Sequence, residues 1–157
     1  MNLIDINTEG IGTAGWHRNL ESFASSVLEI LSIDNWEVSI LLCDDSRIQK
    51  LNRSYRGKDE PTDVLSFALY ADGNQNDYSA IESCATISAG DIIISMETLK
   101  RQAAEFNVSE EEELKRLVIH GILHLKGMDH KTNEVGKEDM LTKQEHILRQ
   151  LAGEALF

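Results

Sequence analysis

Residues 120–130 read His120-Gly-Ile-Leu-His124-Leu-Lys-Gly127-Met-Asp-His130 and hold three of the chain's five histidines. On a helix, residues four apart lie on one face with Cβ atoms about 5–6 Å apart, so His120 and His124 can bind one metal ion. Gly127 can end the helix in a left-handed turn, which would bring His130 back to the same ion. Three imidazoles and one open position are typical of a catalytic zinc site.

The spacing matches the metalloprotease motif H-E-x-x-H-x-x-G-x-x-H at every position but one. Gly121 stands where those enzymes have the glutamate that takes a proton from water. Glycine cannot act as that base. Histidines beside an apolar helix face are often only core or rim residues, but three of them around a helix stop indicate a metal site. The motif therefore predicts metal-assisted hydrolysis of a substrate other than a peptide.

Length and composition predict one globular domain spanning residues 1–157, with 41% hydrophobic and 27% charged residues. No apolar run approaches the roughly 20 residues of a membrane span, and no signal peptide is expected at the N-terminus. Cys43 and Cys84 form no C-x-x-C pair. They are expected to be reduced thiols, so the sequence predicts a soluble cytoplasmic protein with no membrane partner.

The net charge of −12 counts against long, non-specific binding of nucleic acid, but leaves room for a local basic cleft. Residues 53–58 read Arg53-Ser-Tyr-Arg56-Gly-Lys58 and gather three cations in an acidic protein. An arginine beside a glycine suits a phosphate-binding loop, because guanidinium binds phosphate with two parallel hydrogen bonds. A solvated basic loop is an equally good interpretation of this segment alone.

Hydrophobic periodicity predicts alternating strands and helices. Strands are expected at residues 2–6, 36–42, 64–67 and 90–95, and helices at 16–31, 97–106 and 134–151. Two further helices have capping signals, one beginning near Asp44 and one with Ser109 as N-cap. Residues 70–89 are expected to form a surface loop, and Glu110–Glu113 a solvated helix start. Gly121 inside a helix costs about 1 kcal/mol against alanine, so close approach of a strand or of substrate is expected there.

Three segments together resemble the YbeY family, bacterial rRNA maturation factors described as metal-dependent, single-strand-specific endoribonucleases. Residues 120–130 are similar to the family signature H-G-x-L-H-L-x-G-[YH]-D-H. Residues 56–67, Arg-Gly-Lys-Asp-Glu-Pro-Thr-Asp-Val-Leu-Ser-Phe, and 90–94, Gly-Asp-Ile-Ile-Ile, look like the second and third family motifs. Ala68 and Met128 depart from the usual proline and aromatic residue, but neither is a proposed ligand.

The resemblance implies a single α/β (α+β) domain, with a small mixed sheet flanked by helices and a metal-binding helix. It implies one zinc ion on His120, His124 and His130, although other divalent metals are open. Arg56 is the expected catalytic residue in an RNA-facing cleft, and Lys58 is expected to bind substrate with it. The implied partners are single-stranded RNA, rRNA and the ribosome or its proteins. The implied roles are maturation of the small-subunit rRNA 3′ end and ribosome quality control.

Two other functions stay open at this point. One is a zinc hydrolase with another substrate, such as a peptide or a small phosphoester. The other is a ribosome-associated binding factor whose metal is structural, although a closed site needs a fourth ligand that the sequence does not offer near His130. The general base is also open, with Asp63 and Asp129 as candidates by position.

Overall fold

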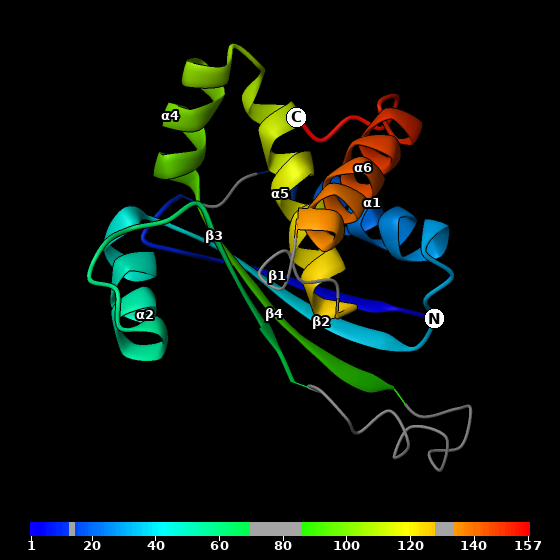
Figure 1. Ribbon diagram of the computed structural model, residues 1–157, viewed down its shortest axis with the longest axis horizontal. Coiled ribbons are helices and arrows are strands. Elements are labelled where there is room, and N and C mark those ends of the chain that lie inside the picture. Colours follow the sequence, from blue (N-terminus) through cyan, green and yellow to red (C-terminus); the bar gives the residue numbers. More distant parts are fainter. Residues whose placement is uncertain (13–14, 70–85, 128–133) are drawn as a thin grey trace.

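A computed structural model describes residues 1–12, 15–69, 86–127 and 134–157, with the backbone alone for residues 134–138. Its centre is a mixed four-stranded sheet with the order β1-β2-β4-β3 (Figure 1). The strands are β1 (Leu3–Glu9), β2 (Trp36–Cys43), β3 (Val64–Ala68) and β4 (Ile87–Ser95). β1, β2 and β4 run parallel, and β3 pairs antiparallel with β4 at one edge.

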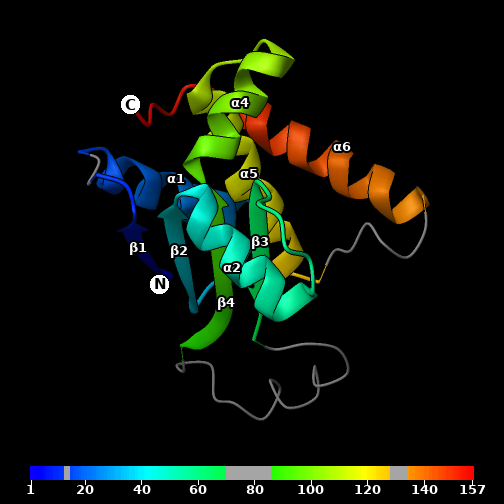
Figure 2. The same ribbon diagram turned by 90° about the vertical axis from the view of Figure 1, so that its left-hand side faces the viewer.

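Helices cover both faces of the sheet unequally. They are α1 (His17–Ile30), α2 (Asp45–Arg56), α4 (Met96–Phe106), α5 (Glu110–Leu125) and α6 (Glu134–Gln150). α1, α5 and α6 enclose the main core on one face, while α2 packs on the other over a small cluster of Cys43, Ile48, Leu65 and Ile93 (Figures 1 and 2). No helix in the described ranges is long and apolar enough to cross a membrane.

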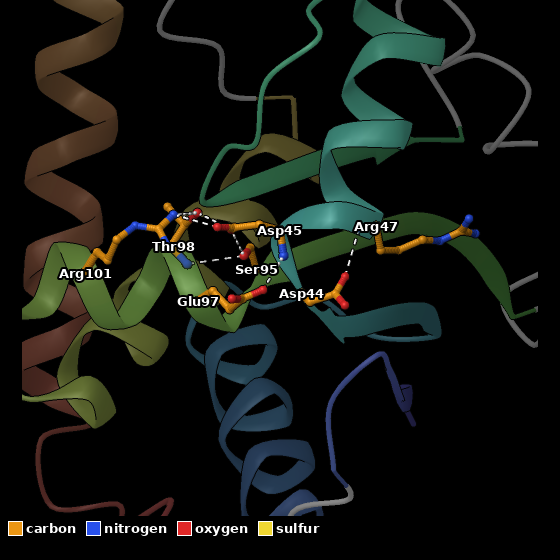
Figure 3. A network of polar contacts seen from close by, with 7 residues as sticks. All are labelled: Asp44, Asp45, Arg47, Ser95, Glu97, Thr98 and Arg101. Carbon is orange, nitrogen blue, oxygen red and sulfur yellow. Dashed lines mark hydrogen bonds and ion pairs between the residues drawn. The ribbon is translucent and has the colours of Figure 1, made fainter.

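A polar network joins the N-termini of α2 and α4, where β2 and β4 end (Figure 3). The Asp45 carboxylate accepts hydrogen bonds from the hydroxyls of Ser95 and Thr98, both at 2.6 Å, and from the Arg101 guanidinium at 2.7 Å. In return, the Glu97 carboxylate accepts from the backbone N–H of Asp45 at 2.9 Å. Each helix therefore supplies an acceptor at the other's first turn, which fixes α2 against the sheet.

The elements expected from periodicity are present, with shifted ends. Asp44 and Ser109 cap α2 and α5, since their side chains accept from Arg47 N and Glu112 N. The predicted end of the loop 70–89 is wrong, because strand β4 already begins at Ile87. Residues 88–90, Ser-Ala-Gly, carry no apolar alternation, and the pairing of β4 with β2 shifts register between Glu37 and Val38, as at a β-bulge.

Candidate functional site

His120 and His124 lie on consecutive turns of α5 with their rings turned toward each other. Their Nε2 atoms are 3.1 Å apart, and their ring planes cross at 73°. Two imidazole ligands of a tetrahedral zinc ion, at about 2.0–2.1 Å each, would hold their nitrogens about 3.4 Å apart. The pair is half-buried at the edge of the core. The donors and their spacing therefore fit a zinc ion shared between the two Nε2 atoms.

Gln144 of α6 holds the other side of the His120 ring. Its side chain is only 4% exposed, and its Oε1 lies 2.8 Å from His120 Nδ1. An amide oxygen can only accept, so Nδ1 carries the proton and Nε2 presents its lone pair. Metal-binding histidines are commonly oriented by such a partner on the second ring nitrogen. Gln144 therefore sets both the tautomer and the direction of His120.

Sequence reasoning missed Gln144, although a signal for it exists. The buried positions of α6 recur at helical spacing and are Met140, Ile147, Leu148 and, just beyond the helix, Leu151. Gln144 falls on the same stripe, four residues after Met140. A lone amide at a core position needs a buried partner, because an unpaired one costs roughly 1–3 kcal/mol.

Gly121, between the two histidines, lets α5 approach the sheet closely. A Cβ on this residue would lie 2.9 Å from both Cδ1 and Cγ2 of Ile92 on β4. The close approach of a strand expected from the sequence is thus confirmed, and the neighbour is a strand side chain. The glycine determines how deeply the turn that carries the histidines sits against β4.

α5 ends as the motif predicts. Its last helical residue is Leu125, and Gly127 follows with a φ of +97° and an N–H that donates to the His124 carbonyl at 2.9 Å. His130 and Asp129 lie outside the described residues, so the third ligand stays a prediction. In the ranges that the structure covers, no group of three His, Cys, Asp or Glu residues is arranged to hold a metal.

Arg56 and Lys58 lie at the C-terminal end of α2, on the opposite face of the sheet from α5. Gly57 ends that helix in a left-handed conformation, with a φ of +71°. The Arg56 guanidinium reaches the edge strand, where Nη2 makes a long hydrogen bond of 3.5 Å to the Ser66 carbonyl. Lys58 is exposed. Both predicted substrate-binding residues are therefore accessible, and Arg56 reaches β3.

The sheet register links Arg56 to the histidine pair. Ser66, which Arg56 contacts, is the partner of Ile92 across the β3–β4 ladder. The Ile92 side chain in turn lies 2.9 Å from where a Cβ on Gly121 would be, between His120 and His124. Arg56 and the histidines thus lie at one level of the sheet, on its two faces, near the edge formed by β3.

A partly buried charge cluster of Glu113, Arg116 and Glu145 secures α6 against α5. Glu113 is 3% exposed and accepts from Arg116 at 3.2 Å, so the expected solvated helix start is wrong at this residue. Burial raises the pKa of Glu113, and the neighbouring Arg116 opposes that effect. Arg116 also donates to Glu145 of α6 at 3.0 Å. Because Glu145 adjoins Gln144, this cluster fixes the segment that orients His120.

Two other residues singled out in the sequence, Cys43 and Asp63, lie in surroundings that favour a structural role. Cys43 is fully buried, and burial, with a contribution from the Asp44 carboxylate, raises its pKa to about 12. Such a thiol stays protonated at neutral pH. Cys84 lies outside the described residues. Asp63 accepts from Val64 N at 2.8 Å and from the Thr62 hydroxyl at 3.3 Å. These bonds favour a role in starting β3 over one as general base.

Comparison with known proteins identifies the family. The family model described as Endoribonuclease YbeY matches residues 4–152. The chain belongs to the YbeY family. An Endoribonuclease YbeY of Treponema denticola is 50% identical over 132 residues, covering 83% of this chain and 81% of the relative. The corresponding protein of Treponema pallidum is 43% identical, and the match covers 96% of this chain and 90% of the relative. That of Borreliella burgdorferi is 49% identical, and the match covers 82% of each chain.

A solved structure supports the fold of this YbeY-family chain. The solution structure of a Thermotoga maritima protein is 32% identical, with a TM-score of 0.66, and covers 97% of this chain and 91% of its own. The family resemblance and the α/β class with a mixed sheet are thereby confirmed. The ligands and the roles of Arg56 and Lys58 stay predictions.

Proposed function

We propose that this protein is a zinc-dependent, single-strand-specific endoribonuclease. The observation that carries the proposal is the pair of converging Nε2 atoms on α5, with Gln144 on the far side of His120, in a chain of the endoribonuclease YbeY family. His120 and His124 would hold the ion from the helix, and His130 would complete the set. Three protein ligands leave one position for water or substrate, as in other catalytic zinc sites.

In this proposal, one set of residues holds the metal and another set, Arg56 and Lys58, binds RNA. When bound, zinc would supply Lewis-acid chemistry that polarises a phosphoryl oxygen and makes water nucleophilic near neutral pH. Gln144 keeps the proton of His120 on Nδ1, so that the Nε2 lone pair would be available to the ion. Arg56 would bind a phosphate and stabilise the negative charge that develops during cleavage. Lys58 would bind a neighbouring phosphate as a point charge.

The wider role proposed is in ribosome assembly. The family resemblance supports a cytoplasmic enzyme that matures the 3′ end of small-subunit rRNA and takes part in ribosome quality control. The partners proposed on the same basis are rRNA and the ribosome or its proteins. The acidic chain, with a net charge of −12, suits recognition at a local site better than adhesion along RNA.

Replacing Arg56 separates RNA binding from metal binding. Arg56→Ala should keep its zinc, because the side chain contacts the carbonyl of Ser66 and no histidine in the described structure. Its cleavage of single-stranded RNA should fall by a factor of about 100 or more, as when one preorganised donor to a developing charge is lost. The measurements are zinc content by elemental analysis and cleavage rates on matched single- and double-stranded RNAs.

The matched control is Arg18→Ala, which removes an exposed arginine from α1, on the other side of the molecule from α2 (Figure 1). It should cleave RNA like the wild type. Full cleavage by zinc-loaded Arg56→Ala would contradict the role assigned to Arg56. Hydrolysis of short phosphoesters by the wild type without cleavage of RNA would favour a zinc hydrolase with another substrate.

A further inference from the structure

Tyr55 is an aromatic side chain that the fold holds out in solvent. It lies in the last turn of α2 and is 69% exposed, beside Arg56. Its ring is 5.2 Å from the ring of Phe67 on β3, at an interplanar angle of 56°. Phe67 is half-buried and packs against the small core cluster under α2. Tyr55 therefore has a firm support on one side and open solvent on the other.

The segment around Tyr55 is basic within an acidic protein, although Asp91 is the partner of Phe67 across the β3–β4 ladder. Arg53, Arg56 and Lys58 surround it in sequence, and no acidic residue falls within residues 53–58. Asp59 pairs with Arg53 at 3.6 Å, an exposed contact that neutralises one of these cations. Arg56 and Lys58 remain on either side of Gly57, directly after the tyrosine. An aromatic face next to two cations is complementary to a base flanked by phosphates.

Tyr55 is also connected to the histidine pair through the sheet. Phe67, its support, follows Ser66, whose partner Ile92 contacts Gly121 between the histidines. Leu69, 63% exposed, lies two residues beyond Phe67 and adds apolar surface just after the end of the edge strand. A strand of RNA that reaches the histidines around the β3 edge would pass these side chains.

We propose that Tyr55 is a stacking platform for an unpaired base of single-stranded RNA, while Arg56 and Lys58 bind the adjacent phosphates. This inference rests on the proposed function and deepens it, because an exposed aromatic ring can stack only on a base that is free of a duplex. Stacking tolerates any base, since each has a π face, but purines offer more area than pyrimidines. The platform therefore accounts for single-strand preference without base-specific hydrogen bonds.

The test is equilibrium binding of zinc-loaded, full-length protein to fluorescently labelled oligo(A) and oligo(U), with the probe checked for intactness after each titration. The wild type should bind oligo(A) more tightly than oligo(U). Tyr55→Ala should weaken oligo(A) binding by about fivefold or more, the smaller end of the effect of losing one base–aromatic stack. It should also remove most of the preference for oligo(A). Tyr55→Phe should bind within about twofold of the wild type, because the π face is kept.

Salt dependence distinguishes stacking from charge. Tyr55→Ala should leave the slope of log affinity against log salt unchanged, whereas Arg56→Ala should reduce its magnitude by about 0.7, the value for one phosphate contact on a single strand. Phe106→Ala is the matched control. It removes another exposed aromatic ring, 60% exposed, from the end of α4, which lies far from the end of α2 in both ribbon views (Figures 1 and 2).

Three results would overturn the platform. First, the wild type could bind RNA and Tyr55→Ala could bind both RNAs just as tightly as the wild type, which would refute stacking and leave the proposed function intact. Tyr55→Phe could be as weak as Tyr55→Ala with an equally lowered melting temperature, which would make Tyr55 a packing residue of α2. If the wild type bound neither RNA, the proposed function itself would fail, and the platform with it.

Discussion

At the scale of single residues, Gln144 fixes the tautomer and the orientation of the His120 ring. Its buried amide oxygen lies 2.8 Å from Nδ1, which leaves Nε2 to face His124. Gln144→Leu keeps a side chain of similar volume but removes the amide oxygen that accepts from His120 Nδ1. The imidazole then loses its preferred tautomer and orientation. Zinc affinity should fall by about 10- to 100-fold, the usual cost of losing such a partner. Gln144→Glu keeps an acceptor and should bind zinc at least as tightly as the wild type.

Competition with a chromophoric chelator measures the zinc affinity of these two variants without reference to RNA. Gln150→Leu, at the exposed end of α6, is the matched control and should bind zinc normally. Unchanged zinc affinity in a folded Gln144→Leu protein would show that His120 does not depend on the amide, and would remove Gln144 from the site.

Gly121 is the residue that sets the height of the histidine turn above the sheet. In Gly121→Ala the new Cβ would meet two carbons of Ile92 at 2.9 Å, so α5 or Ile92 must move. Alanine favours a helix by about 1 kcal/mol, but overpacking of this kind costs typically 1–3 kcal/mol. We expect a net loss of unfolding free energy, measured by urea denaturation, and weaker zinc binding because the two Nε2 atoms shift.

A double mutant identifies Ile92 as the cause. Gly121→Ala combined with Ile92→Ala should be more stable than the sum of the two single losses predicts, since the cavity accepts the methyl group. Gly153→Ala, where a Cβ would have no neighbour within 4 Å, should be close to neutral. Strict additivity in the double mutant would show that the contact with Ile92 carries no strain.

At the scale of elements, the network at Asp45 decides where α2 lies, and therefore where it presents Tyr55 and Arg56. Partial burial acts to raise the pKa of Asp45, but hydrogen bonds from Ser95, Thr98 and Arg101 outweigh it, so the net pKa is lowered. A lowered pKa stabilises the fold above the pKa of the unfolded chain, near 4, and this stability is lost as pH falls through the folded value.

Asp45→Ala should therefore lose about 1–3 kcal/mol of unfolding free energy at neutral pH, since the buried Ser95 hydroxyl loses its acceptor. The difference from the wild type should shrink below about pH 4, where the wild-type carboxylate becomes protonated. Denaturation across this pH range measures it, with Glu21→Gln on the exposed face of α1 as control. A difference that stays constant down to pH 2 would contradict an ionic role for Asp45.

Local sequence was sufficient for features whose partners are close in the chain. Asp44 and Ser109 cap helices that begin at the next residue, and Gly127 ends α5 three residues after His124. Such patterns are visible because the interacting atoms lie within one turn. The histidine pair of the site was predictable for the same reason, since its spacing is that of a helix turn.

For features that depend on tertiary partners, the sequence can indicate a buried polar position but not the partner. Gln144 acquires its role from a histidine 24 residues earlier, and Asp45 binds hydroxyls about 50 residues later. Glu113 looked like part of a solvated acidic run but is buried against Arg116, which bridges to α6. The identity of a long-range partner has no periodic signature, so only the arrangement of α5, α6 and the sheet reveals it.

At the scale of the whole molecule, the sheet edge at β3 unites two chemistries that come from opposite faces. α5 and α6 supply the converging imidazoles and their orienting amide, and α2 supplies the cations and the exposed aromatic ring. Figure 2 shows α2 and α5 on different sides of the sheet. Under the proposed function, a single RNA chain would contact both groups by passing around this edge. The net charge of −12 disfavours non-specific binding of RNA along the whole surface, so we expect binding to be confined to this edge.

The measurement that tests the account most directly is cleavage of a single-stranded RNA by the wild type and by His120→Ala/His124→Ala, with zinc content determined in both. We expect about one zinc ion per wild-type chain and cleavage that disappears together with the metal in the double variant, because two of three ligands are gone. Circular dichroism would verify that the variant keeps its helices. Cleavage by a folded, zinc-free variant, or a zinc-loaded wild type that leaves RNA intact, would contradict the account.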